Sequence, residues 1–192
     1  GGLYKGEPIG NGRYSDITVL SFHPVKIITT AEGGMALTND DTLAQRLGLL
    51  RSHGITRDAD LMTGPVDGPW SYQQVALGYN YRMTDLQAAL GVSQMTRLHP
   101  YVARRHEIAA RYDRLLADLP LTRPWQHPDS YSAYHLYVIR LHLDAIAPRS
   151  HLQVFEALRA KDIMVNLHYI PVHTQPYYQQ MGFAWGDFPQ AE

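Results

Sequence analysis

Two short apolar runs with a loop between them mark the first part of the chain. Residues 17–22 (ITVLSF) and 34–38 (GMALT) are apolar and rich in strand-forming residues, and each is too short for an ordinary helix. They predict two buried strands that flank a loop. Leucines at helical spacing then predict a helix over residues 41–52, capped by Asn39 or Asp40 and packed on a sheet. These leucines are Leu43, Leu47 and Leu50.

Helix breakers and capping pairs divide the middle of the chain. Residues 58–72 are predicted to form a loop, because they contain Gly64, Pro65, Asp67, Gly68 and Pro69. Thr84 and Gln87 have the spacing of a capping box and predict a helix that runs to about Leu98. Pro100 interrupts the pattern, and an apolar face predicts a second helix over residues 102–119.

The last third of the chain alternates between strand and helix patterns. Residues 134–143 (YHLYVIRLHL) alternate like a strand, residues 150–161 open with a capping pair and predict a helix, and residues 164–169 predict another strand. Strand, helix and strand predict a small α+β domain. Prolines at positions 120, 124 and 128 mark the connection before it, so we expect two domains, residues 1–122 and residues 123–192.

Composition and charge narrow the class of protein. The 192 residues are 45% hydrophobic and 18% charged, with a net charge of -1 and a pI near 6.9. These values fit a globular protein and give no general attraction to nucleic acid or acidic membranes. No apolar run approaches the roughly 20 residues that a membrane helix needs, and these residues contain no cysteine for disulfides or zinc. We expect a cytoplasmic protein that binds neither nucleic acid nor membrane.

One lysine stands out from its surroundings. Lysine occurs at positions 5, 26 and 161, and Lys26 lies in the aliphatic segment 25–28, ahead of the turn at 33–34 (Gly-Gly). Burial disfavours the ammonium form of an amine, and a neutral lysine amine is the nucleophile of Schiff-base chemistry. Ser21, five residues earlier, offers a hydroxyl to an anionic group. From these residues alone, the alternative is a lysine whose stem lies on apolar surface while its amine reaches water.

Several motifs follow one another over nearly the whole chain. They are SFHPVK at 21–26 with TTAEGGM at 29–35, RSHGITR at 51–57, GPWSY at 68–72, LGYNYRMTDLQAALG at 77–91 and HYIPVHTQPYY at 168–178. Together they resemble the sugar aminotransferases of the DegT/StrS type. Separated motifs in a fixed order are more specific than one short pattern, which chance can supply.

The resemblance implies an α/β fold of the aspartate aminotransferase type, fold type I of the pyridoxal-phosphate enzymes. Residues 1–122 would be the C-terminal portion of the large, cofactor-binding domain with its interdomain helices, and residues 123–192 most of the small α+β domain. Family members have a long portion before the segment that matches Gly1 and a short stretch after Glu192. We therefore expect this chain to be a fragment, with further cofactor contacts in the preceding portion.

The resemblance also assigns roles around the cofactor pyridoxal 5′-phosphate. Lys26 matches the lysine that binds this cofactor covalently and moves the proton during transamination, and Ser21 matches a residue that bonds to its phosphate. Asn80 matches an asparagine that reaches the phosphate in the neighbouring subunit's site, which implies a homodimer with shared active sites. Without the resemblance, Ser21 would be a strand-end serine and Asn80 an ordinary turn residue.

Within the family the chain is most similar to the aminotransferases of pseudaminic acid biosynthesis. The similarity lies in GPWSYQQVALGYNYRMTD, RPWQHPDSYSAYHLYVIRL and NLHYIPVHTQPYY. It implies transfer of an amino group, with glutamate as the expected donor, to the C4 keto carbon of a UDP-linked 4-keto-6-deoxy-N-acetylhexosamine, in the synthesis of a cell-surface sugar. His168, Tyr169 and His173 match the border of the nucleotide-sugar site and can bond to hydroxyl or phosphate oxygens.

The residues also bear on four other interpretations of this chain. Another nucleotide keto sugar is an alternative substrate, because related enzymes keep the lysine and asparagine motifs. A metal site at His168 and His173 is disfavoured by their spacing, the proline between them and the lack of a third ligand, so we expect no metal. A dehydratase of this fold would carry a histidine in place of Lys26. A catalytically silent piece that acts as an assembly domain stays open.

Overall fold

The computed structural model describes all 192 residues and divides them into two compact units. The first unit comprises Gly1–Leu115 and Trp125–Tyr137, and the second comprises Leu116–Pro124 and Val138–Glu192. The chain thus leaves the first unit after Leu115, returns for residues 125–137, and leaves again. The predicted division of the family fold into residues 1–122 and 123–192 stays a prediction.

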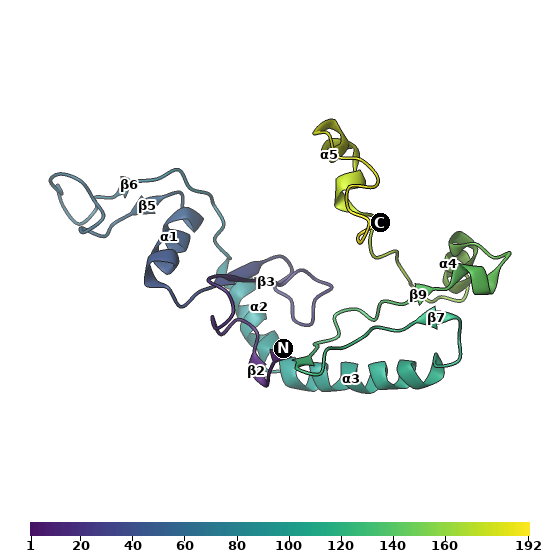
Figure 1. The fold of residues 1–192 in the computed structure, drawn as a ribbon. Coiled ribbons are helices and arrows are strands. Elements are labelled where there is room, and N and C mark those ends of the chain that lie inside the picture. Colours follow the sequence, from purple (N-terminus) through teal and green to yellow (C-terminus); the bar gives the residue numbers. More distant parts are fainter. The chain divides into compact units, whose positions relative to one another are not determined.

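Short antiparallel strands open the first unit (Figure 1). Strand β1 (Leu3–Tyr4) pairs with β2 (Glu7–Pro8) and with β8 (Ser130–Tyr131). Strands β3 (Thr18–Ser21) and β4 (Gly34–Leu37) form a hairpin in which Ser21 lies opposite Gly34. The two predicted strands and the loop between them are therefore confirmed.

The prediction that these two strands are buried is wrong. Val19 of β3 is 77% exposed and Met35 of β4 is 47% exposed. The pair forms a two-stranded sheet in this chain, with no further strand beside it. Apolar strand residues become buried only where a second layer or further strands cover the face on which they lie.

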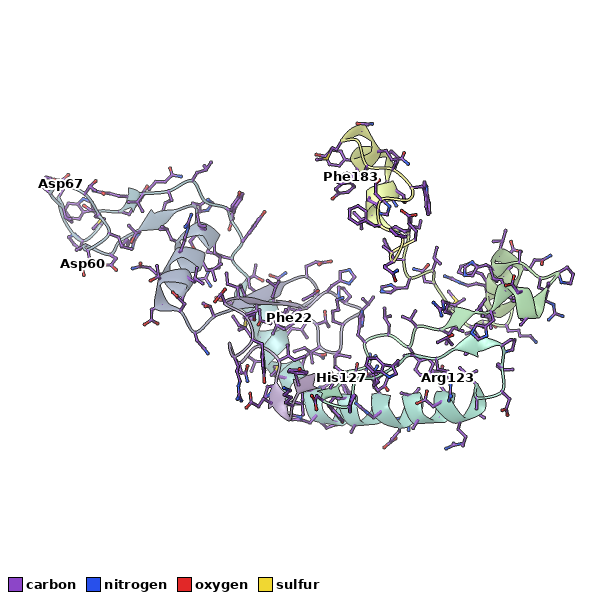
Figure 2. The ribbon with its side chains drawn as sticks, viewed as in Figure 1. Phe22, Asp60, Asp67, Arg123, His127 and Phe183 are labelled. Carbon is purple, nitrogen blue, oxygen red and sulfur yellow. The ribbon has the colours of Figure 1, made fainter.

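Helix α1 (Asp41–Arg51) begins where the sequence predicts it. The Asp40 carboxylate accepts a hydrogen bond from the Leu43 backbone N–H at 2.9 Å, which satisfies one of the first unpaired donors of the helix. The helix contacts strand β5 (Ile55–Thr56), which pairs with β6 (Gln73–Gln74). The segment between these two strands is irregular, as predicted, and carries Asp60 and Asp67 at its outer turns (Figure 2).

Two consecutive helices complete the first unit. Helix α2 (Asp85–Met95) has both bonds of the predicted capping box, because the Thr84 hydroxyl accepts from the Gln87 N–H and the Gln87 side chain accepts from the Thr84 N–H. Helix α3 (Leu98–Leu115) starts earlier than predicted and ends earlier. Pro100 does not interrupt it, since a proline in the first turn removes an N–H that has no partner within the helix anyway.

The second unit contains more irregular chain than predicted. Strand β7 (Leu121–Thr122) pairs with β9 (Arg140–Leu141), which is all that forms of the strand predicted at 134–143. The strand predicted at 164–169 is wrong, because those residues pair with no other strand. The helix predicted from Ser150 is confirmed as α4 (His151–Arg159), with its complete capping box. The 3-10 turns η1 (Leu143–Ile146) and η2 (Val172–Thr174) and helix α5 (Pro176–Gln180) complete the unit.

The buried residues of the first unit lie at the loop after β3, along α3, and at Gly54 and Thr56 in and beside β5. Ile28 and Thr30 are buried in the loop, and Val102 and Ala109 are buried on the helix. Helix α2 approaches the loop closely at Gly91, where an added Cβ would lie 2.9 Å from a methyl carbon of Thr30. The packing of this loop against α2 thus fixes the segment that carries Lys26.

None of the helices combines the length and the apolar character of a membrane-spanning segment.

Candidate active site

Lys26 lies in a folded loop that joins β3 to β4. The Phe22 N–H donates to the Gly33 carbonyl at 2.9 Å, and the Phe22 carbonyl accepts from the Thr30 N–H at 3.0 Å and from the Thr29 hydroxyl at 2.9 Å. These bonds tie both ends of the loop together. The Lys26 N–H donates to the His23 carbonyl at 2.9 Å, which makes a turn just before the lysine side chain. The lysine is therefore held on a defined backbone.

Helix α2 fixes the second half of this loop. The Glu32 carbonyl accepts from the Thr30 hydroxyl at 2.8 Å and from the Gln87 side-chain amide at 3.1 Å. Gly33 has a φ of 153°, and a Cβ added there would lie 2.3 Å from the Thr30 hydroxyl oxygen. Only glycine fits this conformation and spacing. The glycine predicted to give a tight turn is required for the close packing of the loop.

The Lys26 amine lies next to a histidine that the sequence analysis did not single out. Its Nζ atom is 3.4 Å from Nε2 of His135, a residue 109 positions away in the chain, and both side chains are partly buried. Ser21, at the end of β3, is exposed, and its hydroxyl oxygen lies 3.5 Å from the His23 N–H. The Ser21 O–H proton remains available to another acceptor. The structure thus brings an amine, an imidazole and a hydroxyl to one hairpin and its surroundings.

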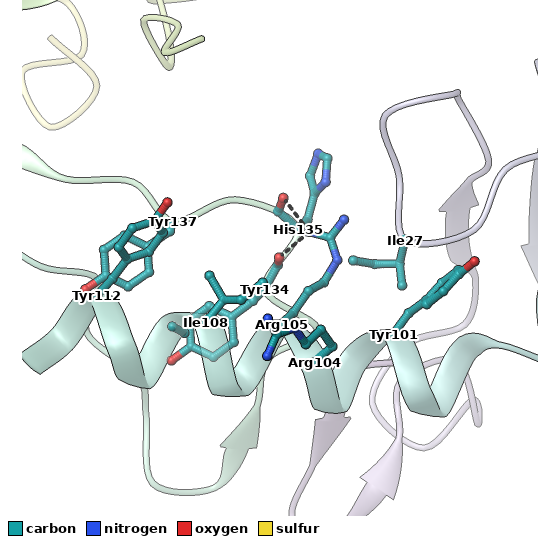
Figure 3. A pocket seen from close by; sticks show the side chains of 10 residues that line it. Ile27, Tyr101, Arg104, Arg105, Ile108, Tyr112, Tyr134, His135 and Tyr137 are labelled. Atoms are coloured by element: carbon teal, nitrogen blue, oxygen red, sulfur yellow. Dashed lines mark hydrogen bonds between the residues drawn. The ribbon is translucent and has the colours of Figure 1, made fainter. Parts of the chain in front are cut away.

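A pocket of about 490 Å³ opens beside this loop (Figure 3). Helix α3 forms one side of it, the segment 134–137 forms another, and Ile27 closes one end. Its lining includes four tyrosines and two arginines, namely Tyr101, Tyr112, Tyr134, Tyr137, Arg104 and Arg105. Burial raises the pKa of Tyr134, and the negative charge of Asp113 raises it further, so its phenol stays neutral and can donate a hydrogen bond at physiological pH.

Asn80 is held by its backbone neighbours against the end of α1. The Tyr79 N–H donates to Leu50 at 2.7 Å, the Tyr79 carbonyl accepts from His53 at 2.8 Å, and the Tyr81 N–H donates to Arg51 at 3.0 Å. The Tyr79 and Tyr81 rings stack with centroids 4.8 Å apart. Asn80 itself is exposed and its side chain makes no hydrogen bond within the chain. The structure presents this amide at the surface and does not bring it into contact with Lys26.

The three predicted substrate residues lie in the second unit and differ in exposure. His168 and Tyr169 are exposed, and their rings meet edge to face at 5.8 Å. His173 is 8% exposed, packs against Phe188, and has Nε2 2.7 Å from a carboxylate oxygen of Glu192. The His173 ring is therefore occupied by contacts within its own unit, while His168 and Tyr169 are open to a ligand. Substrate binding by all three stays a prediction.

The sequence of all 192 residues matches one protein family, the DegT/DnrJ/EryC1/StrS aminotransferase family. The chain belongs to this family. The predicted resemblance is thereby confirmed, and so is the fold of the pyridoxal-phosphate enzymes of type I.

Two relatives carry names that refer to polysaccharide biosynthesis or to a UDP-linked amino sugar. The chain is 39% identical over 191 residues to the spore coat polysaccharide biosynthesis protein SpsC of Bacillus subtilis, covering 98% of this chain and 48% of that protein. It is 36% identical over 182 residues to the UDP-4-amino-4,6-dideoxy-N-acetyl-beta-L-altrosamine transaminase of Campylobacter jejuni, covering 94% and 45%. The chain thus spans about half the length of these relatives.

A solved structure of a Streptococcus pneumoniae protein has the same fold. The protein Spr1654 in its PLP form superposes with a TM-score of 0.84 at 30% identity, over 100% of this chain and 47% of that one. Its PMP form superposes with a TM-score of 0.83. These are the aldehyde and amine forms between which an aminotransferase cofactor alternates, so the likeness extends to a protein that carries this cofactor.

Proposed function

We propose that this protein is part of a pyridoxal-phosphate aminotransferase that acts on a nucleotide-linked keto sugar. The observation that carries the proposal is the Lys26 amine. It is partly buried, fixed on the β3–β4 loop and 3.4 Å from an imidazole, in a chain that belongs to an aminotransferase family. An amine used only for solubility would extend freely into water.

The residues present fit pyridoxal phosphate by their chemistry. A primary amine such as Lys26 condenses with an aldehyde, and a hydroxyl such as Ser21 donates a hydrogen bond to a phosphate. The two sit on one hairpin, where the glycines that follow keep the backbone free of side chains. Lys26 would hold the cofactor covalently and Ser21 would bind its phosphate.

The chemistry divides between the cofactor and the chain. Pyridoxal phosphate, when bound, supplies the electron sink for breaking a C–H bond next to an amine. Lys26, once its amine is released by an amino-acid donor, holds and moves a proton at Nζ as the general base. Ile27, the residue after Lys26, and His135, whose ring lies beside the Lys26 amine, both line the pocket along α3.

For the substrate, we infer a UDP-linked 4-keto-6-deoxy-N-acetylhexosamine, with glutamate as the amino donor. The named Campylobacter jejuni relative supports this substrate class. His168 and Tyr169 are proposed to bond to oxygen atoms of the nucleotide sugar, because both are exposed and both carry donors. The product would enter pseudaminic acid biosynthesis in the cytoplasm.

A second substrate class is favoured by one specific comparison. The identity to the Bacillus subtilis spore coat protein is at least as high as that to the transaminase. An aminotransferase for another nucleotide keto sugar of a surface polysaccharide fits the same Lys26 loop. The substrate assay separates the two, because only the matching keto sugar would be converted to an amino sugar.

The experiment that tests the function uses the full-length protein. Borohydride reduction in the presence of pyridoxal phosphate should attach the cofactor to the peptide that contains Lys26, as seen by mass spectrometry. Lys26→Ala should abolish this attachment and reduce turnover by several orders of magnitude, because no amine replaces it. Lys161→Ala serves as the control and should change neither. Normal turnover of Lys26→Ala would contradict the proposal, and absence of any cofactor attachment would favour an assembly role.

A further inference from the structure

We propose that His135 accepts the proton that the Lys26 amine must lose to act as a nucleophile, and that Arg105 is the positioning residue that holds His135 in place. The inference rests on the proposed function, since it adds a residue to the same site. Its starting observation is the 3.4 Å distance between Lys26 Nζ and His135 Nε2, two partly buried atoms from distant parts of the chain.

Arg105 fixes the backbone on which His135 stands. Its guanidinium donates to the Tyr134 carbonyl at 2.8 Å and to the His135 carbonyl at 3.3 Å, from the middle of the 18-residue helix α3 (Figure 3). A guanidinium offers several donors in a rigid plane, so it can fix two successive carbonyls at once. The backbone of His135 is thereby anchored to helix α3 by hydrogen bonds.

The backbone turn before His135 directs its ring away from this helix. Tyr134 has a φ of 47°, in the left-handed region that residues with a side chain rarely adopt. In Figure 3 the Tyr134 ring lies along α3, while the His135 ring points away from the helix. Such a conformation persists only where surrounding contacts hold it. The turn therefore places the two neighbouring rings on opposite sides, and His135 is the one that meets Lys26.

Further contacts fix the same segment on both sides of His135. The Tyr137 hydroxyl donates to Asp113 at 2.6 Å. On the other side, His106 stacks on Tyr131 with ring centroids 4.0 Å apart and lies 2.7 Å from the Ser132 carbonyl. Arg105, His106 and Asp113 all belong to α3, and Asp113 lies about two turns after the other two, so the three lie near one side of the helix. One helix face thus aligns the whole segment 131–137.

The proposed step moves a single proton. A bond between hydrogen and Nζ of Lys26 breaks, the electron pair stays on Nζ, and a bond forms between that proton and Nε2 of His135. Histidine suits this exchange, because imidazole gains and loses a proton near physiological pH. A distance of 3.4 Å is slightly longer than the usual N–H hydrogen bond of about 2.7–3.2 Å, so the flexible lysine can also leave the pair once its amine reacts.

The test measures Lys26 reactivity in the full-length, cofactor-free protein. Competitive acetylation at neutral pH, followed by mass spectrometry of peptides, gives the labelling rate of Lys26 relative to Lys5 and Lys161 in the same molecule. In His135→Ala and His135→Gln this ratio should fall by roughly tenfold or more, a modest share of what a general base supplies. Added imidazole should restore the rate in His135→Ala. Glutamine keeps a hydrogen-bond acceptor but takes up no proton, so it should not rescue.

Matched controls separate this role from a structural one. His127→Ala removes an exposed imidazole from the same chain segment and should leave the ratio unchanged. Arg105→Met should lower the labelling ratio, but by less than His135→Ala does. Arg104→Met, which changes another arginine of the same pocket, should leave the ratio unchanged, because Arg104 pairs with Glu107. An unchanged ratio in His135→Ala, or a full rate in His135→Gln, would overturn the proposal, and so would a loss that imidazole leaves untouched. Since no cofactor or sugar is added, failure of the proposed function leaves this readout intact.

Discussion

The imidazole Nε2 atom of His173 lies 2.7 Å from a carboxylate oxygen of Glu192, and this pair closes the C-terminal segment of the second unit on itself. Glu192 also accepts hydrogen bonds from the Gly186 N–H at 2.8 Å and from the Phe188 N–H at 3.4 Å. One side chain therefore satisfies two backbone donors and one imidazole. The pair thus links His173, which is predicted to bind substrate, to Glu192.

This closure makes the stability of the segment depend on pH. Partial burial raises the pKa of Glu192, but the hydrogen bonds from Gly186, His173 and Phe188 outweigh it and lower the pKa below its ordinary value. A carboxylate whose folded pKa is lowered contributes stability above the unfolded pKa, and this contribution is lost as the pH falls through the folded pKa. An NMR titration should therefore show Glu192 changing protonation at a lower pH than a free glutamate. In Glu192→Gln the Gly186 amide signal should lose this pH dependence; a titration at or above the ordinary value would contradict the structure.

Asn80 is predicted to act across a subunit boundary. Because its side chain is exposed and bonds to nothing in its own chain, Asn80→Ala should not unfold the protein but should weaken cofactor binding by about 1.5–3 kcal/mol, the contribution of a hydrogen bond to a charged group. A mixed dimer of Lys26→Ala and Asn80→Ala subunits checks the location. Both lesions should fall in one site, so about half of the wild-type activity should remain. One inactive site together with a second site that binds the cofactor more weakly would instead place Asn80 in its own subunit's site.

The capping box at Thr84 is predicted to stabilise α2 and with it the lysine loop. Thr84→Ala removes a hydroxyl that accepts from the Gln87 N–H, and should lower the free energy of unfolding by about 1 kcal/mol. Gln87 also donates to Glu32, so the change should also increase hydrogen exchange in the loop that carries Lys26. Thr42→Ala, in the exposed first turn of α1, is the matched control and should be close to neutral in denaturant titrations.

Two glycines of neighbouring elements should respond oppositely to alanine. Gly54 has a φ of 69°, and a Cβ there would lie 1.8 Å from the Ala76 carbonyl oxygen, so Gly54→Ala should destabilise the protein by roughly 1–3 kcal/mol. Gly48 lies inside α1 with nothing within 4 Å of its added Cβ, so Gly48→Ala should stabilise it by up to about 1 kcal/mol. Denaturant unfolding of both variants measures the contrast. Equal effects would mean that the crossing of residues 54 and 76 is not as close as described.

The sequence by itself determined the elements whose signals are local. Caps at Asp40, Thr84 and Ser150 act within three residues of themselves, so the starts of α1, α2 and α4 could be read directly. The family and its lysine loop could also be recognised, because several motifs had to occur in one order. Strand predictions at 134–143 and 164–169 were the weakest, since a strand depends on a partner that local alternation does not supply.

Only the tertiary structure decided which distant residues meet. His135 belongs to an alternating run that looks like an ordinary strand, and nothing in that run reveals that a tyrosine turn and an arginine of α3 bring its ring to 3.4 Å from Lys26. His173, equally polar in sequence, became buried because Glu192 supplies its partner 19 residues later. Burial and pairing of a polar side chain depend on contacts that are remote in sequence, and such contacts exist only once the chain has folded.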